Sequence, residues 1–327
     1  MPKRLLYILL LIPLLAACGS GTPATDESGH RAVYYWKTTL RIGEQEKDFL
    51  ARHDIDRMYL RMFDVDVDID YTKDEADVIP VATLSFESAV PDSIEIIPTV
   101  FITLNALKHC EGGEEELAGK IVTRVLNMCS YNDLGPIREV QFDCDWTEST
   151  RHIYDRLCGV AKDLLHAQGV ALSGTIRLHQ VEQAEYPFDS GVLMLYNTGA
   201  VKDPDTGNSI LAYEDVEKYL GVPSRIGKFR AARRHNCSRI DFAYPTFSWK
   251  VEFTTDGVFR RIIPDSGRGA EFSDGIIRRE FPEFSEIKRV KDLVSATLGT
   301  DGSNIIYHLD CGNLSKYTDD EIEDILR

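Results

Sequence analysis

The chain has 327 residues, of which 28% are charged and 43% hydrophobic, and its formal net charge is −16. This composition is typical of a soluble globular protein with a sizeable core. The acidic balance argues against a nucleic-acid partner, because there is no excess of Lys and Arg to neutralise phosphates. The length is large for one ordinary domain but normal for one α/β barrel with insertions.

The N-terminus has the features of an export signal. Lys3 and Arg4 precede an apolar run over 5–15, which ends in the tetrapeptide Leu-Ala-Ala-Cys at Cys18. The run is too short to span a bilayer as a lasting helix, but it fits the core of a signal peptide. The tetrapeptide resembles a bacterial lipobox, which implies cleavage before Cys18 and a lipid anchor on its sulfur.

The predicted organisation follows from this signal. Residues 1–17 form the lipoprotein signal peptide, 18–30 a small and polar linker, and 31–327 a single domain. The residue after Cys18 is glycine rather than aspartate, which by resemblance to the bacterial sorting rule favours the outer membrane. We therefore expect a cell-envelope protein that meets the membrane through the anchor on Cys18.

Strand and helix patterns alternate along the predicted domain. Strand patterns centre near residues 34, 59, 99, 141, 174, 194, 242 and 307, and helical patterns cover 44–53, 114–129, 153–164, 210–220, 286–298 and 317–326. Such alternation indicates a parallel sheet, and eight strands fit a closed barrel. An open doubly wound sheet is the alternative, but no glycine-rich phosphate loop follows a strand. We predict a (β/α)8 TIM-type barrel with an insertion between the last two strands.

Two segments between the second and third predicted strands are less regular. Residues 64–70 carry an aspartate at every second position. This run lacks the glycine and distal glutamate of a calcium-binding EF-hand loop, so we interpret it as a solvated acidic loop. Residues 79–86 are predicted to be an extra strand or the arm of a hairpin.

The cysteines indicate no metal site. Beyond Cys18 there are six, and they have neither a CxxC pair nor a Cys/His spacing typical of zinc. Cys129, Cys144 and Cys158 fall on apolar faces and are expected to be small core residues. We predict no metal and no cofactor.

The stretch 139–148 is the strongest candidate for a functional site. Side chains alternate along a strand, so Gln141, Asp143 and Asp145 share one face. In a closed parallel barrel, such a polar row belongs at the C-terminal mouth, where active sites lie. Buried carboxylates need partners, and we expect Arg61 and Arg177 to project inward from neighbouring strands and neutralise them.

Aromatic residues gather at the predicted strand ends. Rings with one polar tip suit sites where the apolar face of a sugar stacks and its hydroxyl groups need partners. For any single ring, ordinary core packing is the competing interpretation, and Trp36 and Trp249 are preferred as platforms because both lie past their strands. The aromatic residues at or just beyond strand ends are Tyr35, Trp36, Trp146, Tyr196, Tyr244 and Trp249, and all of them except Tyr35 are candidates for sugar binding, together with the amide of Asn197.

Three motifs resemble those of the chitinase-like glycoside hydrolases of family 18. The segment 143–147 resembles the Asp-x-Asp-x-Glu motif of that family, 194–197 its Met-x-Tyr-Asp motif, and 241–249 its Pro-x-Tyr-Gly-x-x-Trp region. The resemblance implies a TIM barrel that recognises a glycan, with Asp143, Asp145 and Tyr196 in the catalytic positions. The whole chain also resembles a group of bacterial envelope lipoproteins.

The chain departs from this family at the residue that matters most for hydrolysis. Thr147 takes the place of the catalytic Glu, and a hydroxyl group cannot serve as a general acid near neutral pH. Glu148 is one residue further on, and Asn197 replaces an aspartate of the family. Three functions therefore stay open: glycan recognition without the acid of the family, hydrolysis through Asp143, Asp145 and Glu148, or a non-enzymatic envelope scaffold.

Overall fold

The computed structural model describes residues 29–70, 75–183, 185–235, 237–264, 274–299 and 301–327. The predicted signal peptide, the anchor on Cys18 and nearly all of the predicted linker lie outside these residues. Within the described part of the chain, no helix is both long and apolar enough to cross a membrane.

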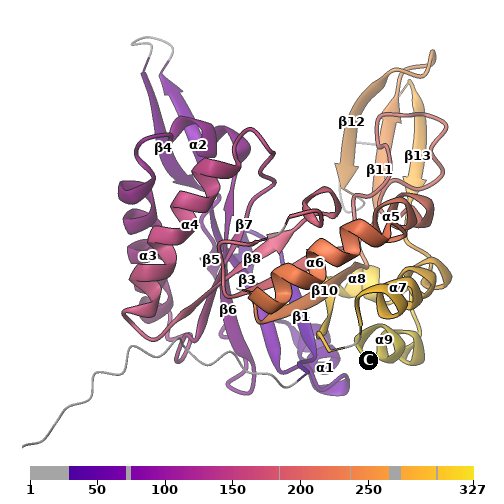
Figure 1. Ribbon diagram of the computed structural model, residues 1–327. Coiled ribbons are helices and arrows are strands. Elements are labelled where there is room, and N and C mark those ends of the chain that lie inside the picture. The colour runs from indigo at the N-terminus through magenta and orange to yellow at the C-terminus, as the bar shows by residue number, and fades with distance from the viewer. Residues whose placement is uncertain (1–28, 71–74, 184, 236, 265–273, 300) are drawn as a thin grey trace, which may run out of the picture.

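Eight parallel strands close into a barrel (Figure 1). The first strand pairs with both the second and the last strand of the barrel, which completes the closure. The predicted TIM-type barrel is confirmed, and its strands in spatial order are β1 (Ala32–Tyr35), β3 (Arg57–Asp70), β6 (Glu95–Ile102), β7 (Glu139–Asp143), β8 (Ala171–Ile176), β9 (Ser190–Met194), β10 (Arg239–Pro245) and β14 (Asn304–Tyr307).

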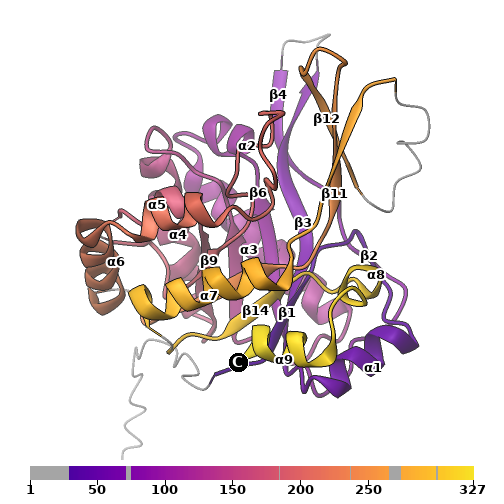
Figure 2. The same ribbon diagram turned by 90° about the vertical axis from the view of Figure 1, so that its right-hand side faces the viewer.

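Helices cover the outside of the barrel (Figures 1 and 2). The six predicted helices are present, and the fourth begins at Tyr213 rather than at residue 210. The basic segment around 230–234, for which no helix was predicted, belongs to α6. The helices are α1 (Glu44–Arg52), α2 (Leu104–His109), α3 (Glu114–Tyr131), α4 (Arg151–His166), α5 (Tyr213–Leu220), α6 (Pro223–His235), α7 (Phe284–Leu298), α8 (Cys311–Leu314) and α9 (Asp319–Leu326), with a short 3₁₀ turn, η1 (Leu178–Gln180), after β8.

The alternation of side chains along β7 divides the core into two layers. Val140, Phe142 and Cys144 are fully buried in the apolar layer between strands and helices. Gln141 and Asp143 are buried on the other face, inside the barrel. This matches the expected pattern of a parallel strand that is covered on both sides, except that the inner face carries polar groups near its C-terminal end.

The acidic run over 64–70 is not a loop. It is the second half of β3, which continues beyond the barrel and pairs antiparallel with β4 (Glu75–Val81). Val65 and Val67 pack against the apolar layer, while Asp66 accepts a hydrogen bond of 2.7 Å from Thr103. Alternating valine and aspartate is thus the period-two pattern of a strand with one apolar face, and the prediction of a solvated loop is wrong. The predicted hairpin arm is present as β4, and the next segment, β5 (Ser85–Phe86), pairs with β2 (Thr39–Leu40).

The predicted insertion is a small antiparallel sheet at the mouth of the barrel. It consists of β11 (Trp249–Phe253), β12 (Phe259–Pro264) and β13 (Ile276–Glu280), with β11 in the middle. Figure 1 shows that this sheet and the β3–β4 hairpin rise from the same end of the barrel. That end is the C-terminal end of the barrel strands, because β11 follows β10 and the hairpin extends β3.

Candidate functional site

A cavity of about 860 Å³ opens at the C-terminal mouth of the barrel. Its lining comes from the ends of most barrel strands and from the insertion sheet. The structure brings eight of the predicted site residues together in this lining: Trp36, Arg61, Asp143, Asp145, Arg177, Tyr196, Asn197 and Trp249.

Asp143 forms the buried acidic floor of the cavity. Its side chain accepts a hydrogen bond of 2.6 Å from the hydroxyl of Thr175 on the neighbouring strand β8. Burial raises the pKa of Asp143, although the nearby Arg177 guanidinium acts in the opposite direction. The carboxyl group is therefore held in a place that favours its protonated form more than water does.

Asp145 reaches further into the cavity, and half of its side chain is exposed. It forms an ion pair with Arg177, whose guanidinium carbon lies 5.2 Å from the centre of the Tyr196 ring. Burial tends to lower the pKa of Arg177, but Tyr196 and the two aspartates outweigh burial and raise it. Arg177 thus carries a permanent positive charge between the two carboxylates.

Arg61 has a different partner from the one expected. It binds Asp64 of its own strand, with 2.7 Å between Nε and Oδ1, and its guanidinium carbon lies 5.3 Å from the centre of the Trp36 ring. Because the backbone of β3 has an irregular register between Arg61 and Phe63, an acid three residues further along the strand can meet this guanidinium. Arg61 therefore supports the Trp36 ring rather than Asp143 or Asp145.

Five aromatic rings form a continuous wall around the cavity. Neighbouring ring centres lie 5.8 Å apart for Trp36 and Tyr307, 4.3 Å for Tyr307 and Tyr196, 5.9 Å for Tyr196 and Phe247, and 5.3 Å for Phe247 and Trp249. The Tyr307–Tyr196 pair is stacked, and the other rings are tilted or meet edge to face. Such a wall beside charged groups offers apolar surface and hydrogen-bonding groups to one ligand.

His308 adds a partly buried imidazole to the cavity lining. Burial lowers its pKa from the ordinary 6.5 to about 4, although Asp310 partly opposes this effect. Between pH 6.5 and pH 4 the ring is therefore mostly neutral in the folded protein and mostly protonated in the unfolded chain.

This burial predicts an acid-sensitive stability. Below pH 6.5 the unfolded chain binds a proton at His308, whereas the folded protein does not bind it until the pH approaches 4. The contribution of neutral His308 to the free energy of unfolding is therefore complete above pH 6.5 and is lost as the pH falls toward 4. Between pH 7 and pH 4 the wild type should lose about 3 kcal/mol more than a His308→Gln variant. Urea unfolding at a series of pH values measures this difference, and parallel curves for the two proteins would contradict it.

Four of the predicted site residues lie outside the cavity lining. Gln141 is buried beneath it and accepts a hydrogen bond of 2.7 Å from the hydroxyl of Tyr34. Trp146 packs on Tyr154 in the layer under α4, with 5.9 Å between ring centres, and Tyr244 is fully buried in the same apolar layer. These three residues belong to the core, and for Trp146 and Tyr244 this agrees with the competing interpretation of ordinary core packing.

Glu148 does not return to the mouth. The strand β7 ends at Asp143, and the chain then makes a turn in which the backbone N–H of Thr150 donates to the carbonyl of Thr147 at 2.9 Å. Glu148 is exposed on this turn. Burial raises the pKa of Asp155 on α4, and the nearby Glu148 adds to this effect. The hydroxyl of Thr147 is occupied within the turn, by Ser149 at 3.0 Å and Thr150 at 3.3 Å.

Several residues of the cavity were not predicted as site residues. Tyr307 ends the last strand and His308 and Asp310 follow it, so the same strand-end criterion that selected Trp36 would have found them. Ile262, Pro264 and Lys316 come from the insertion sheet and from the segment after α8. No strand-end pattern marks these three, because neither segment belongs to the barrel.

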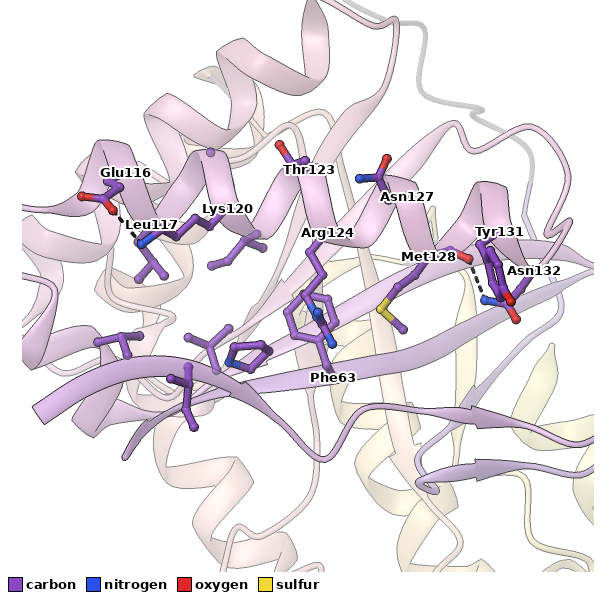
Figure 3. Close-up of a pocket in the computed structure, with 16 residues that line it drawn as sticks. Phe63, Glu116, Leu117, Lys120, Thr123, Arg124, Asn127, Met128, Tyr131 and Asn132 are labelled. Carbon is purple, nitrogen blue, oxygen red and sulfur yellow. Dashed lines mark hydrogen bonds and ion pairs between the residues drawn. The ribbon is translucent and has the colours of Figure 1, made fainter. Parts of the chain in front are cut away.

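A second cavity, of about 950 Å³, lies outside the barrel between α3 and the β3–β4 hairpin (Figure 3). Its floor is apolar, and the guanidinium of Arg124 extends over the Phe63 ring at 5.1 Å. Lys120 and Glu116 pair with each other along its rim at 2.6 Å. This groove has no cluster of carboxylates and rings like that of the mouth, so the mouth is the better candidate for chemistry or sugar recognition. Among the described residues, no group of three or more His, Cys, Asp and Glu side chains is arranged to hold a metal ion.

Comparison with known proteins supports the fold. No protein-family model and no curated sequence matches the chain. The chitinase from Chromobacterium violaceum has a similar structure, with a TM-score of 0.53 at 12% identity over 91% of this chain and 98% of that one. The class V chitinase from Nicotiana tobaccum in complex with NAG4 gives 0.50 at 8% identity over 91% and 97%. The chitinase-like agglutinin RobpsCRA from Robinia pseudoacacia gives 0.51 at 10% identity over 90% and 98%. The chain therefore has the barrel of the chitinase-like glycoside hydrolases, which confirms the remote resemblance noted from its motifs.

Proposed function

We propose that this protein is a cell-envelope lipoprotein that binds a glycan at the mouth of its glycoside-hydrolase-like barrel. The wall of five rings around the cavity carries this proposal. Rings of this kind stack on the apolar faces of sugars, while Asp145, Arg177 and Asn197 beside them provide partners for hydroxyl groups. Two similar folds are consistent with this use: a chitinase in complex with NAG4 and a chitinase-like agglutinin.

The envelope location rests on the sequence. The lipobox-like ending at Cys18, the short apolar run before it and the polar linker after it favour a lipid-anchored domain outside the cytoplasm. Glycans of the cell surface or of the surroundings would then be accessible to the barrel mouth.

Glycan recognition is favoured over hydrolysis, because the described residues at the mouth do not include the acid that the hydrolase family uses. None of the described residues that line the cavity is a glutamate, and both Thr147 and Glu148 lie on the turn outside it. Ordinary glycoside hydrolysis needs an acid that protonates the leaving oxygen. The position that corresponds to this acid in the family therefore carries a threonine here, and this threonine is not part of the cavity lining.

Hydrolysis is the second candidate, and one observation favours it. Burial raises the pKa of Asp143, and Asp145 stands beside it at the cavity surface. A carboxyl group with a raised pKa next to an ionised one is the arrangement used for acid and base roles in glycosidases. This candidate requires that Asp143 or Asp145 take over the role of the missing glutamate.

Replacement of a wall residue tests glycan recognition. A Trp36→Ala variant removes the first ring of the wall and should lower glycan affinity at least about tenfold, as expected for an aromatic anchor. Isothermal titration calorimetry measures the change, with Tyr131→Ala as the control, because Tyr131 is 88% exposed on α3 away from the mouth. Equal affinities for the Trp36→Ala variant and the wild type would exclude the wall as a sugar platform.

An Asp145→Asn variant separates recognition from catalysis. It keeps the shape of the side chain but removes the charge that faces Arg177. A binding protein should retain most of its glycan affinity, because asparagine still offers an oxygen and an amide group to a sugar hydroxyl. Chromatography of released sugars measures turnover. If the wild type releases sugar and the Asp145→Asn variant does not, the protein is an enzyme instead.

A further inference from the structure

The insertion sheet contains a carboxylate that is completely buried at its contact with the mouth. Glu280 ends β13, and its side chain has no exposed surface. One oxygen, Oε2, accepts hydrogen bonds from the indole N–H of Trp249 at 2.8 Å and from Ser209 at 2.8 Å (backbone N–H) and 2.6 Å (hydroxyl). The other, Oε1, accepts from Nε of Arg278 at 2.6 Å. A buried charge needs such partners. Here the four hydrogen bonds come from three residues, Trp249, Ser209 and Arg278, in segments around the cavity.

The first of these partners is the last ring of the aromatic wall. Trp249 pairs directly with Glu280 across β11 and β13, and its ring meets Phe247 edge to face at 5.3 Å. Since the only donor of an indole is its N–H group, the bond to Glu280 fixes which edge of the ring points into the sheet. The remaining surface of the ring is then presented to the cavity.

The other partners hold the loop that follows β9. Arg278, held by Glu280, donates to the carbonyls of Asp203 at 2.6 Å and Val201 at 3.1 Å. Ser209 lies further along the same loop. Asn197, at the start of this loop and in the cavity lining, donates its backbone N–H to the carbonyl of Ile210 at 2.7 Å. One carboxylate therefore connects the insertion sheet, the aromatic wall and the loop that carries Asn197.

We propose that Glu280 is a positioning residue of the glycan site: it orients the Trp249 ring and the loop after β9 without touching the ligand. This inference rests on the proposed function, because it assumes that the wall binds sugar. It implies that the insertion sheet contributes to the recognition surface through the contact of Glu280 with Trp249.

The substitution Glu280→Gln tests the role with little change of volume. Glutamine has one acceptor oxygen, so its amide N–H₂ must face either Arg278 or the Trp249 and Ser209 donors. Glycan affinity should fall about tenfold, because a Trp249 ring without this fixed contact must be ordered when the glycan binds. The matched control is Glu252→Gln, because Glu252 is a second buried carboxylate of the same sheet and accepts from Arg260 and Arg261. The control should bind the glycan like the wild type.

Fluorine NMR gives a readout that does not depend on any ligand. The chain has three tryptophans, so protein labelled with 5-fluorotryptophan gives three resonances that single Trp→Phe variants assign. In Glu280→Gln the Trp249 resonance should shift or broaden. The resonance of Trp146, buried against Tyr154, should stay in place. In Glu252→Gln all three resonances should keep their positions.

The outcomes separate this inference from the proposed function. An unchanged Trp249 resonance and unchanged affinity in Glu280→Gln would overturn the positioning role while glycan binding stands. A displaced Trp249 resonance in a protein that binds no glycan would support the orienting contact and reject the glycan site. If Glu280→Gln does not fold, Ser209→Ala removes one donor to Glu280. Its Trp249 resonance is then expected to shift, and an unchanged position would overturn the inference.

Discussion

An Arg239→Met variant is expected to be about 3 to 5 kcal/mol less stable than the wild type, which is the usual cost of leaving buried charges without their partner. Arg239 lies at the start of β10, inside the N-terminal end of the barrel. Its Nε is 2.9 Å from Asp241 and its Nη2 is 3.1 Å from Glu139. These carboxylates are 1% and 6% exposed, so water cannot replace the guanidinium. Burial raises the pKa of Asp241, and the Arg239 guanidinium opposes this rise. The variant lacks the guanidinium, so burial is no longer opposed by it.

Urea unfolding at neutral pH measures the loss, and methionine keeps most of the aliphatic volume of arginine. An Arg41→Met variant is the control, because the ion pair of Arg41 with Glu87 has side chains that are 73% and 45% exposed. Exposed pairs of this kind contribute roughly 0 to 1 kcal/mol. A similar loss in the free energy of unfolding of both variants would show that Arg239 does not stabilise the barrel interior more than an exposed arginine does.

Replacement of Gly302 by alanine is expected to destabilise the protein by about 3 kcal/mol or more, because it forces the backbone to move. A Cβ atom at this position would lie 2.1 Å from the carbonyl oxygen of Ile240 and 3.1 Å from the ring of Phe242. The next residue, Ser303, donates its N–H to Asp241 at 2.8 Å and accepts from the N–H of Phe242 at 2.9 Å. A shift of the chain at Gly302 therefore disturbs the contact between β10 and β14.

Gly159→Ala provides the matched control for this substitution. Gly159 is exposed in the middle of α4, and a Cβ atom there would meet nothing within 4 Å. Alanine at a helix interior should raise stability by up to about 1 kcal/mol. Thermal unfolding of the two variants should thus give changes of opposite sign, and a stable Gly302→Ala protein would contradict the close approach of the chain at this point.

The sequence predicted the barrel well because its signals are local and repeated. Each buried strand, such as 191–196, is a short apolar run, and each helix, such as 114–129, has a stripe at helical spacing. The run over 64–70 was misinterpreted because its aspartates drew attention to a possible ion site. The valines between them form the apolar face that packs on the barrel.

The site was predicted in part, and the misses have two physical causes. Strand ends were recognisable, which placed Asp143, Tyr196 and Trp249 together at the mouth. The end of β7 could not be located to the residue, so Trp146 was assigned to the mouth although it packs under α4. Contacts made by the insertion sheet, such as that of Glu280 with Trp249, join segments that no local pattern connects.

The turn after β7 also changes the interpretation of the missing acid. Position 147, where the hydrolase family has its glutamate, is held on the turn by hydrogen bonds with Ser149 and Thr150. A Thr147→Glu substitution would remove these hydrogen bonds, so we expect it to change the turn as well as to add a carboxylate.

The most direct test of the central proposal uses the soluble fragment 25–327 and a broad panel of bacterial and host glycans. Calorimetry reports binding and thin-layer chromatography reports released sugar in the same samples. We predict that at least one glycan binds without release, and that Trp36→Ala and Trp249→Ala both weaken this binding. Absence of binding across the panel, or binding that both variants leave unchanged, would contradict glycan recognition at the barrel mouth.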